Sequence, residues 1–222
     1  MNQALAYSYE TDAPACSSKY LLPVLRRVLA GVPERAHVLD LGCGNGALTA
    51  GLARPGWDVR AFDCSRAAID IARASYPGIR FQLGDATEPL DLTPGRFDLV
   101  LAVEVIEHVL NPRGLLRNAY AALRPGGALV VTTPYHGYWK NLTLALLGRM
   151  DAHWDPLWDA GHVKFFSRAT LSLLLAETGF SGLRFTGAGR VPGLWKSMVL
   201  AADRPPAASH HPPRCYGVEC ES

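Results

Sequence analysis

The sequence contains no long run of apolar residues. No uninterrupted stretch approaches the ~18–20 residues of a membrane-spanning helix, and the first residues lack the basic and apolar segments of a secretory signal. Charge of one sign is not in excess either, because 22 Lys and Arg residues stand against 20 Asp and Glu residues. A chain with so even a balance offers nucleic acid no obvious electrostatic track, so we do not expect nucleic acid as a partner.

Cysteine is sparse, and its pattern does not suggest a disulfide framework. The five residues are odd in number and scattered along the chain: Cys16, Cys43, Cys64, Cys215 and Cys220. Free thiols are the simplest interpretation, and they are typical of a reducing compartment. Together with the missing export signal, this predicts a cytoplasmic globular protein.

What the chain does contain is enough apolar material for one sizeable core. Hydrophobic residues make up 49% of its 222 residues, and domains commonly run to ~100–200 residues. Short apolar runs alternate with segments of helical period, which predicts a doubly wound α/β domain with a mainly parallel sheet and helices on both faces. The expected strands are 37–41, 58–62, 79–83, 97–103, 128–133, 183–186 and 197–201, and the expected helices begin near residues 17, 46, 65, 111 and 167.

Three segments fall outside this alternation. Residues 1–15 are aperiodic, so we expect an N-terminal arm before a domain that spans 16–202. Residues 134–164 form a long excursion between the fifth strand and the next helix, which we interpret as a lid-like insertion. Residues 203–222 are rich in proline and have no period, so we expect a disordered tail there.

The most informative motif is a glycine-rich bend directly after the first strand. Asp40 lies at the end of that strand, and Gly42 and Gly44 begin a Gly-x-Gly-x-Gly loop that opens a helix. Bare backbone lets a ligand approach, since side chains at these two glycines would fill its space. Gly42, Gly44 and Ala47 also satisfy the nicotinamide form G-x-G-x-x-A. Asp40 separates the two interpretations, because a carboxylate would repel a pyrophosphate and attract a cationic ammonium or sulfonium ligand.

This loop resembles the first motif of class I S-adenosylmethionine-dependent methyltransferases, and residues 20–201 keep to the order of that family. By resemblance, Asp63 after the second strand contacts the ribose hydroxyls, Asp85 after the third contacts the adenine, and Val103 lies under the adenine or near the methyl group. The resemblance also implies a seven-stranded Rossmann-like methyltransferase sheet whose last pairing is antiparallel. A nicotinamide-dependent oxidoreductase is the alternative. The residues that the resemblance assigns to S-adenosylmethionine are Asp40, Gly42, Gly44, Asp63, Asp85 and Val103.

The acceptor site is predicted directly after the fourth strand, at Glu104, Glu107 and His108. If this turn is helical, these positions share one face, so two carboxylates and an imidazole converge and suit a divalent ion. The cluster resembles that of ubiquinone-biosynthesis O-methyltransferases and of the 2′-O-methyltransferases of small RNAs, where a later histidine joins it. The matching residue is His162, in a segment that resembles the quinone-type enzymes more closely. The implied ligands of Mg²⁺ or another divalent metal are Glu104, Glu107, His108 and His162. In the alternative, the cluster only packs or acts as a simple base.

Two further features concern the acceptor. His136 follows the fifth strand at the rim where acceptors enter, and we predict it as a further general base beside His108 and His162, the alternative being a surface-loop histidine. An apolar stripe at helical spacing lies in the insertion, from Trp139 to Met150. We favour a lid over an apolar acceptor, with peripheral membrane contact through 139–158 and a cap that buries its stripe as alternatives.

These features predict an S-adenosylmethionine-dependent methyltransferase that acts on the oxygen of a small or lipid-like hydroxylated acceptor, with or without a metal. One alternative is a small-molecule methyltransferase directed to nitrogen or carbon. The other is a protein that binds S-adenosylmethionine without catalysis.

Overall fold

A seven-stranded sheet organises the chain in the computed structural model, which describes residues 11–92, 95–151, 153, 154, 157 and 161–207. The strand order is β3-β2-β1-β4-β5-β7-β6, with β7 antiparallel to both of its neighbours and the other pairings parallel. The strands are β1 (Ala36–Leu41), β2 (Trp57–Asp63), β3 (Arg80–Leu83), β4 (Phe97–Val103), β5 (Leu123–Pro134), β6 (Ser181–Ala188) and β7 (Ser197–Asp203). This is the predicted fold class.

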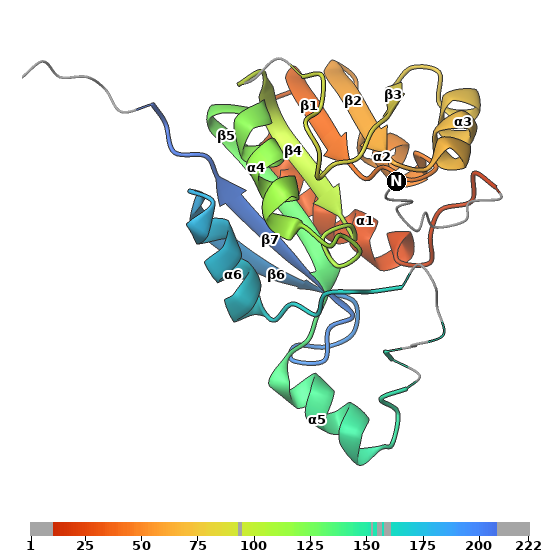
Figure 1. Cartoon of the computed structure of the whole chain (residues 1–222), viewed down its shortest axis with the longest axis vertical. Helices are drawn as coiled ribbons and strands as arrows, with labels where there is room; N and C mark the ends of the chain where they lie inside the picture. Colours follow the sequence, from red (N-terminus) through yellow and green to blue (C-terminus); the bar gives the residue numbers. More distant parts are fainter. Residues whose placement is uncertain (1–10, 93–94, 152, 155–156, 158–160, 208–222) are drawn as a thin grey trace, which may run out of the picture.

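Helices cover both faces of the sheet (Figure 1). They are α1 (Ser18–Val28, continued by the short 3₁₀ helix Leu29–Gly31), α2 (Ala47–Leu52), α3 (Arg66–Ser75), α4 (Pro112–Ala122), α5 (Tyr138–Leu146) and α6 (Arg168–Glu177). Leu115 of α4 and Leu171 of α6 belong to the core cluster on one face, and Leu21 and Leu25 of α1 to the cluster on the other. Because β4 is covered on both faces, its residues are nearly all apolar, as predicted.

The helix starts follow from local capping. The side chains of Ser65, Asn111 and Ser167 accept hydrogen bonds from backbone amides at the starts of α3, α4 and α6, as expected for N-cap residues. The first helix begins at Ser18, near the predicted start at residue 17, although Ser17 has helical backbone angles and makes no side-chain cap hydrogen bond. The burial of Leu21 on the sheet stabilises this helix instead.

The fifth strand begins earlier than predicted. The sequence predicts this strand over residues 128–133, but β5 starts at Leu123, which pairs with Phe97. The register shifts before Ala128, and the Gly126 amide donates to the Arg204 carbonyl at 2.9 Å. The glycines therefore form an irregular start of the strand, because the chain after β7 supplies hydrogen-bond partners that local sequence does not reveal.

The predicted segment boundaries are mostly outside what the structure can test. Residues 1–10 of the expected arm and 208–222 of the expected tail lie outside the described residues, and β7 runs through Asp203. Within the described part of the chain, no helix has the length and apolar character needed to cross a bilayer. The cytoplasmic location stays a prediction.

Candidate active site

The loops that carry the predicted site residues meet at one edge of the sheet, the lower edge in Figure 1. Since β1, β2 and β4 are adjacent and parallel, their carboxyl ends all reach this edge. That is where doubly wound folds bind ligands. The insertion that contains α5 leaves from the same edge, after β5.

The glycine loop is shaped by its backbone and by neighbouring side chains. Gly42, Gly44 and Gly46 all have positive φ angles, of 81°, 55° and 79°. A Cβ at Gly42 would lie 2.4 Å from Cγ2 of Val105, and one at Gly46 would lie 2.7 Å from Phe81. The prediction that Gly42 is bare in order to leave room for a ligand therefore needs correction, since the side chain of Val105 already occupies that side.

Asp40 is buried beneath the loop, where its carboxylate accepts a hydrogen bond of 2.6 Å from the Thr49 hydroxyl. Burial raises the pKa of Asp40 to about 6, although the Thr49 hydroxyl acts in the opposite direction. A cationic ligand nearby would stabilise the ionised form. The position agrees with the predicted role toward a sulfonium donor, which itself stays a prediction.

Asp63, at the end of β2, holds the loop in place. One of its carboxylate oxygens accepts from the Gly44 amide and the other from the Ser65 amide, both at 2.8 Å. Burial raises the pKa of Asp63, and the two amides oppose that shift. Each oxygen can still accept a second hydrogen bond, so the predicted contact to ribose hydroxyls is compatible with this geometry.

The other two predicted cofactor residues lie at neighbouring strand ends. One oxygen of Asp85 accepts from the Thr87 amide at 2.8 Å and from the Thr87 hydroxyl at 2.7 Å, which makes a local turn after β3. Val103 is the buried last residue of β4. Contacts of either residue with adenine stay predictions.

The chain after β4 is a turn, so the prediction of a helical face for Glu104, Glu107 and His108 is wrong. Glu104 has a left-handed backbone, with a φ of 54°, which breaks the helical spacing. Its carboxylate accepts from the hydroxyls of Thr132 at 2.7 Å and Ser197 at 3.1 Å. Burial raises the pKa of Glu104 to about 6 against the effect of these hydroxyls.

Three of the four predicted acceptor-site ligands do converge. Possible ligand atoms of Glu107, His108 and His162 all lie within 4.8 Å of one another. The amides of Val163 and Lys164 donate to the backbone carbonyl of Glu107 at 2.8 and 3.0 Å, which brings the segment containing His162 against this turn. Glu104 is not part of the set, because it faces Thr132 and Ser197.

Glu107 is the most unusual group in the site. It is 0% exposed, and neither carboxylate oxygen has a hydrogen-bond partner among the described residues. Burial, with the charge of Glu104 as a further cause, raises the pKa of Glu107 well above its ordinary value. The backbone at Glu107 and the Thr133 hydroxyl oppose this shift, so the cost of burying the carboxyl group is only partly offset.

His136 is not the surface-loop histidine of the alternative interpretation, because it is only 7% exposed. Its ring lies 5.3 Å from Phe165, 5.5 Å from His153 and 6.2 Å from Trp154, measured between ring centroids. Burial lowers the pKa of His136 to about 4, and burial has the same effect on His162. In this environment both imidazoles are therefore neutral at pH 7.

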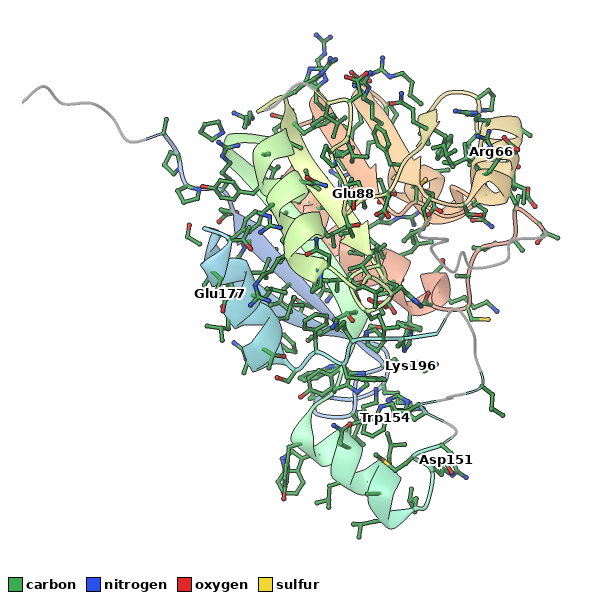
Figure 2. All side chains as sticks on the ribbon, viewed as in Figure 1. Arg66, Glu88, Asp151, Trp154, Glu177 and Lys196 are labelled. Carbon is green, nitrogen blue, oxygen red and sulfur yellow. The ribbon has the colours of Figure 1, made fainter. Side chains whose placement is uncertain are left out.

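Sequence reasoning missed the residues that hold the two sides of the acceptor region together. Lys140 is buried in α5, where its ammonium donates to the carbonyls of Tyr135 at 2.8 Å and Lys196 at 3.4 Å. Figure 2 labels Lys196 at the edge of the sheet from which the insertion extends. Lys140 is the single charged residue in the sequence of α5, and this was the signal that could have revealed it.

The fold and the glycine loop define the class of the protein, a doubly wound α/β enzyme of the methyltransferase type. The family described as a methyltransferase domain matches residues 16–184. A structure from Thermotoga maritima, titled a possible histamine N-methyltransferase, has a TM-score of 0.65 at 20% identity and covers 85% of this chain and 91% of its own. At that identity the likeness concerns the fold alone.

Sequence relatives are more specific. The chain is 31% identical over 187 residues to a ubiquinone biosynthesis O-methyltransferase of Methylobacterium nodulans, covering 78% of this chain and 75% of the relative. It is 35% identical over 174 residues to the enzyme of the same name from Azorhizobium caulinodans, covering 75% and 67%. The chain thus belongs to the class I S-adenosylmethionine-dependent methyltransferases, as predicted, and S-adenosylmethionine is the methyl donor that the family implies.

Proposed function

We propose that this methyltransferase transfers the methyl group to the oxygen of a small or lipid-like hydroxylated acceptor. The observation that carries the proposal is the cluster of the buried Glu107 with the partly buried His108 and His162, in which the segment after β4 meets the end of the insertion. An acceptor hydroxyl must lose a proton when it is methylated, and this cluster supplies groups that can take it. The relatives named as O-methyltransferases support the same acceptor atom.

The chain's residues have separate tasks in such a reaction. The sulfonium methyl group of the donor supplies the electrophile, and Asp40 and Asp63 hold that donor at the glycine loop. The acceptor oxygen forms a bond to the methyl carbon, the bond from carbon to sulfur breaks with its electron pair left on sulfur, and the hydroxyl proton passes to Nε2 of His108. Nδ1 of His108 faces the Gly161 carbonyl at 3.3 Å, which favours the tautomer that has its lone pair on Nε2.

The Glu107–His108–His162 set also fits a divalent metal. One carboxylate and two imidazoles lie close enough to share an ion, and the carboxyl group of Glu107 is buried. Two imidazoles suit Mn²⁺ or Zn²⁺ better than Mg²⁺, which prefers oxygen ligands. When bound, such an ion would lower the pKa of an acceptor hydroxyl. Metal analysis of the purified wild type and of His162→Ala tests this, with loss of a stoichiometric metal in the variant as the expected result.

An apolar or lipid-like acceptor is supported by the surface of the insertion. Trp139 is 66% exposed and Leu146 is 78% exposed, and they lie seven residues apart on α5, hence on one face. This face does not pack on the domain, so the alternative of a cap with a buried stripe is wrong for these residues. In Figure 1, α5 projects away from the sheet. We propose that the segment 139–158 contacts a membrane surface from which the acceptor is taken, with residues 152, 155, 156 and 158 outside the described part.

Release of S-adenosylhomocysteine in the presence of phenols and catechols, with and without an alkyl tail, tests the acceptor atom. We expect Glu107→Gln to lower the turnover number by about 100-fold or more without changing the Kd for S-adenosylmethionine. Glu88→Gln, an exposed carboxylate away from the cluster, is the matched control. Turnover only with amines or carbon acids would replace the proposal by an N- or C-directed enzyme. Absence of turnover with every acceptor would favour a protein that binds the donor without catalysis.

Co-sedimentation with vesicles of mixed neutral and anionic phospholipid tests the membrane contact. We expect the wild type to sediment with the vesicles and Trp139→Ala/Leu146→Ala to remain in solution. Leu173→Ala, which replaces a leucine on α6 that is 61% exposed, is the control that should sediment like the wild type. If Trp139→Ala/Leu146→Ala sediments with the vesicles as fully as Leu173→Ala does, α5 is excluded as the contact.

A further inference from the structure

Glu104 is held in an unusual backbone conformation by β5. Its amide lies 3.0 Å from Oγ1 and 3.2 Å from the carbonyl of Thr132, and the same hydroxyl donates to Oε1 of Glu104 at 2.7 Å. A left-handed backbone is costly for a residue with a side chain, and such conformations concentrate at functional sites. The fold therefore fixes Glu104 beside the acceptor cluster at an energetic cost.

The second oxygen of Glu104 is reached by a chain of two hydroxyls. Ser197 Oγ donates to Oε2 at 3.1 Å, and the Tyr20 hydroxyl lies 3.1 Å from Ser197 Oγ. An ionised carboxylate only accepts hydrogen bonds, and each hydroxyl has a single proton. Ser197 must therefore donate to Glu104, and Tyr20 must donate to Ser197. The proton count settles the direction of the chain.

The segment that precedes Tyr20 is attached to the other half of the site. The side-chain amide nitrogen of Asn45, in the glycine loop, donates hydrogen bonds to the backbone carbonyls of Thr11 and Ala13 at 2.9 and 2.8 Å. Asn45 is itself buried, so both of its amide hydrogens are used for this attachment. Residues 11–20 therefore run from the cofactor loop to the hydroxyl chain at Glu104.

We propose that Tyr20 is a positioning residue of the acceptor site, which acts through Ser197 to hold the Glu104 carboxylate in the orientation that the reaction needs. Tyr20 lies in α1, before the first strand, and its hydroxyl reaches the Glu104 carboxylate through the hydrogen bond to Ser197. This inference rests on the proposed function, in which groups after β4 orient the acceptor and receive its proton. The Lys196 ammonium lies 5.1 Å from the centroid of the Tyr20 ring. Replacing Tyr20 by phenylalanine removes the hydroxyl and keeps this ring.

The test uses Tyr20→Phe, Ser197→Ala and the double variant in the full chain. Loss of one link should lower kcat about tenfold, while the Kd for S-adenosylmethionine and the melting temperature stay those of the wild type. The double variant should be no slower than Ser197→Ala, because the two hydroxyls act in series. Tyr120→Phe is the control: that ring packs on Phe180, away from the site, and its kcat should not change.

Several results would overturn the inference. One is an unchanged kcat in Tyr20→Phe, and another is a double variant whose loss of kcat is the product of the two single losses. A third is a loss of stability and of donor affinity in the single variants alongside the loss of kcat, which indicates a structural role. If Tyr20→Phe does not fold, an unchanged kcat in Ser197→Ala has the same meaning. If the wild type methylates only amines, the proposed function fails. The ratio of the kcat of Tyr20→Phe to that of the wild type with such an amine then still tests the role of Tyr20. A crystal structure of Tyr20→Phe or Ser197→Ala in which Glu104 keeps its place would overturn the inference without any turnover assay.

Discussion

The two halves of the proposed active site, the predicted cofactor half and the predicted acceptor half, are built in different ways. The cofactor half uses short loops after β1, β2 and β3, where backbone amides and nearby carboxylates contact one another within about one strand-helix unit. The acceptor half gathers Tyr20, Glu104, His162 and Ser197, which are far apart in the sequence. The first half therefore has a readable motif, whereas the second depends on the packing of α1, the insertion and β7.

The halves also differ in how their polar groups are satisfied. Both oxygens of Asp63 accept hydrogen bonds from backbone amides, and Asp40 accepts one from a hydroxyl. The carboxylates of the predicted cofactor half are therefore held in place without a ligand. In the acceptor half, the oxygens of Glu107 have no hydrogen-bond partner among the described residues, and His136 has a buried ring in the same condition. We therefore expect a preformed donor site beside an acceptor site that a ligand completes.

The largest effect is expected in the predicted cofactor half, at Asp63. Asp63→Ala removes the acceptor of two backbone amides and the predicted contact to ribose, so we expect the Kd for S-adenosylmethionine to rise by about 100-fold or more. Isothermal titration calorimetry measures the change, and Asp70→Ala, an exposed carboxylate on α3, is the control. Unchanged affinity would show that the loop does not depend on Asp63.

The contact between the halves is tested at Gly42. An alanine there would have an unfavourable φ of 81° and a Cβ 2.4 Å from Val105, so we expect the free energy of unfolding to fall by about 2–3 kcal/mol. Denaturant unfolding measures the loss, and adding Val105→Ala should restore part of it. Gly31→Ala, where a Cβ meets nothing within 4 Å, is the control. No recovery in the double variant would mean that backbone strain alone is responsible.

The smallest expected effect is the pH dependence of donor binding. Below about pH 6, Asp40 is protonated, so the affinity for the cationic donor should fall by up to about tenfold per pH unit, and Asp40→Asn should abolish this slope. For the free protein the sign is opposite. Burial raises the pKa of Asp40 from 3.8 to about 6, so its contribution to stability is greatest below pH 3.8 and decreases as the pH rises to about 6. Titrations of wild type and variant between pH 5 and 8 check the binding slope, and a slope kept by the variant would assign it to another group.

Much of the fold follows from local patterns, and the errors have a common cause. The predicted β4 has the observed bounds, and Ser65, Asn111 and Ser167 cap helices as expected, because buried strands and N-caps leave marks in neighbouring residues. The predicted start of β5 was wrong because a hydrogen bond in its first part, from the Gly126 amide, goes to the carbonyl of the distant Arg204. The helical spacing assumed at Glu104 failed for the same kind of reason, since Thr132 holds that residue in a left-handed conformation.

The amino-acid sequence by itself determined the alternation of strands and helices, the glycine loop with Asp40 and Asp63, and hence the methyltransferase class. These depend on periodicity and on residues that are neighbours along the chain. Only the tertiary structure decided that Glu104 faces Ser197 and Tyr20, that His162 meets Glu107, and that α5 turns its apolar face outward while Lys140 is buried. Such contacts join distant segments, so their geometry is set by the packing of the whole domain.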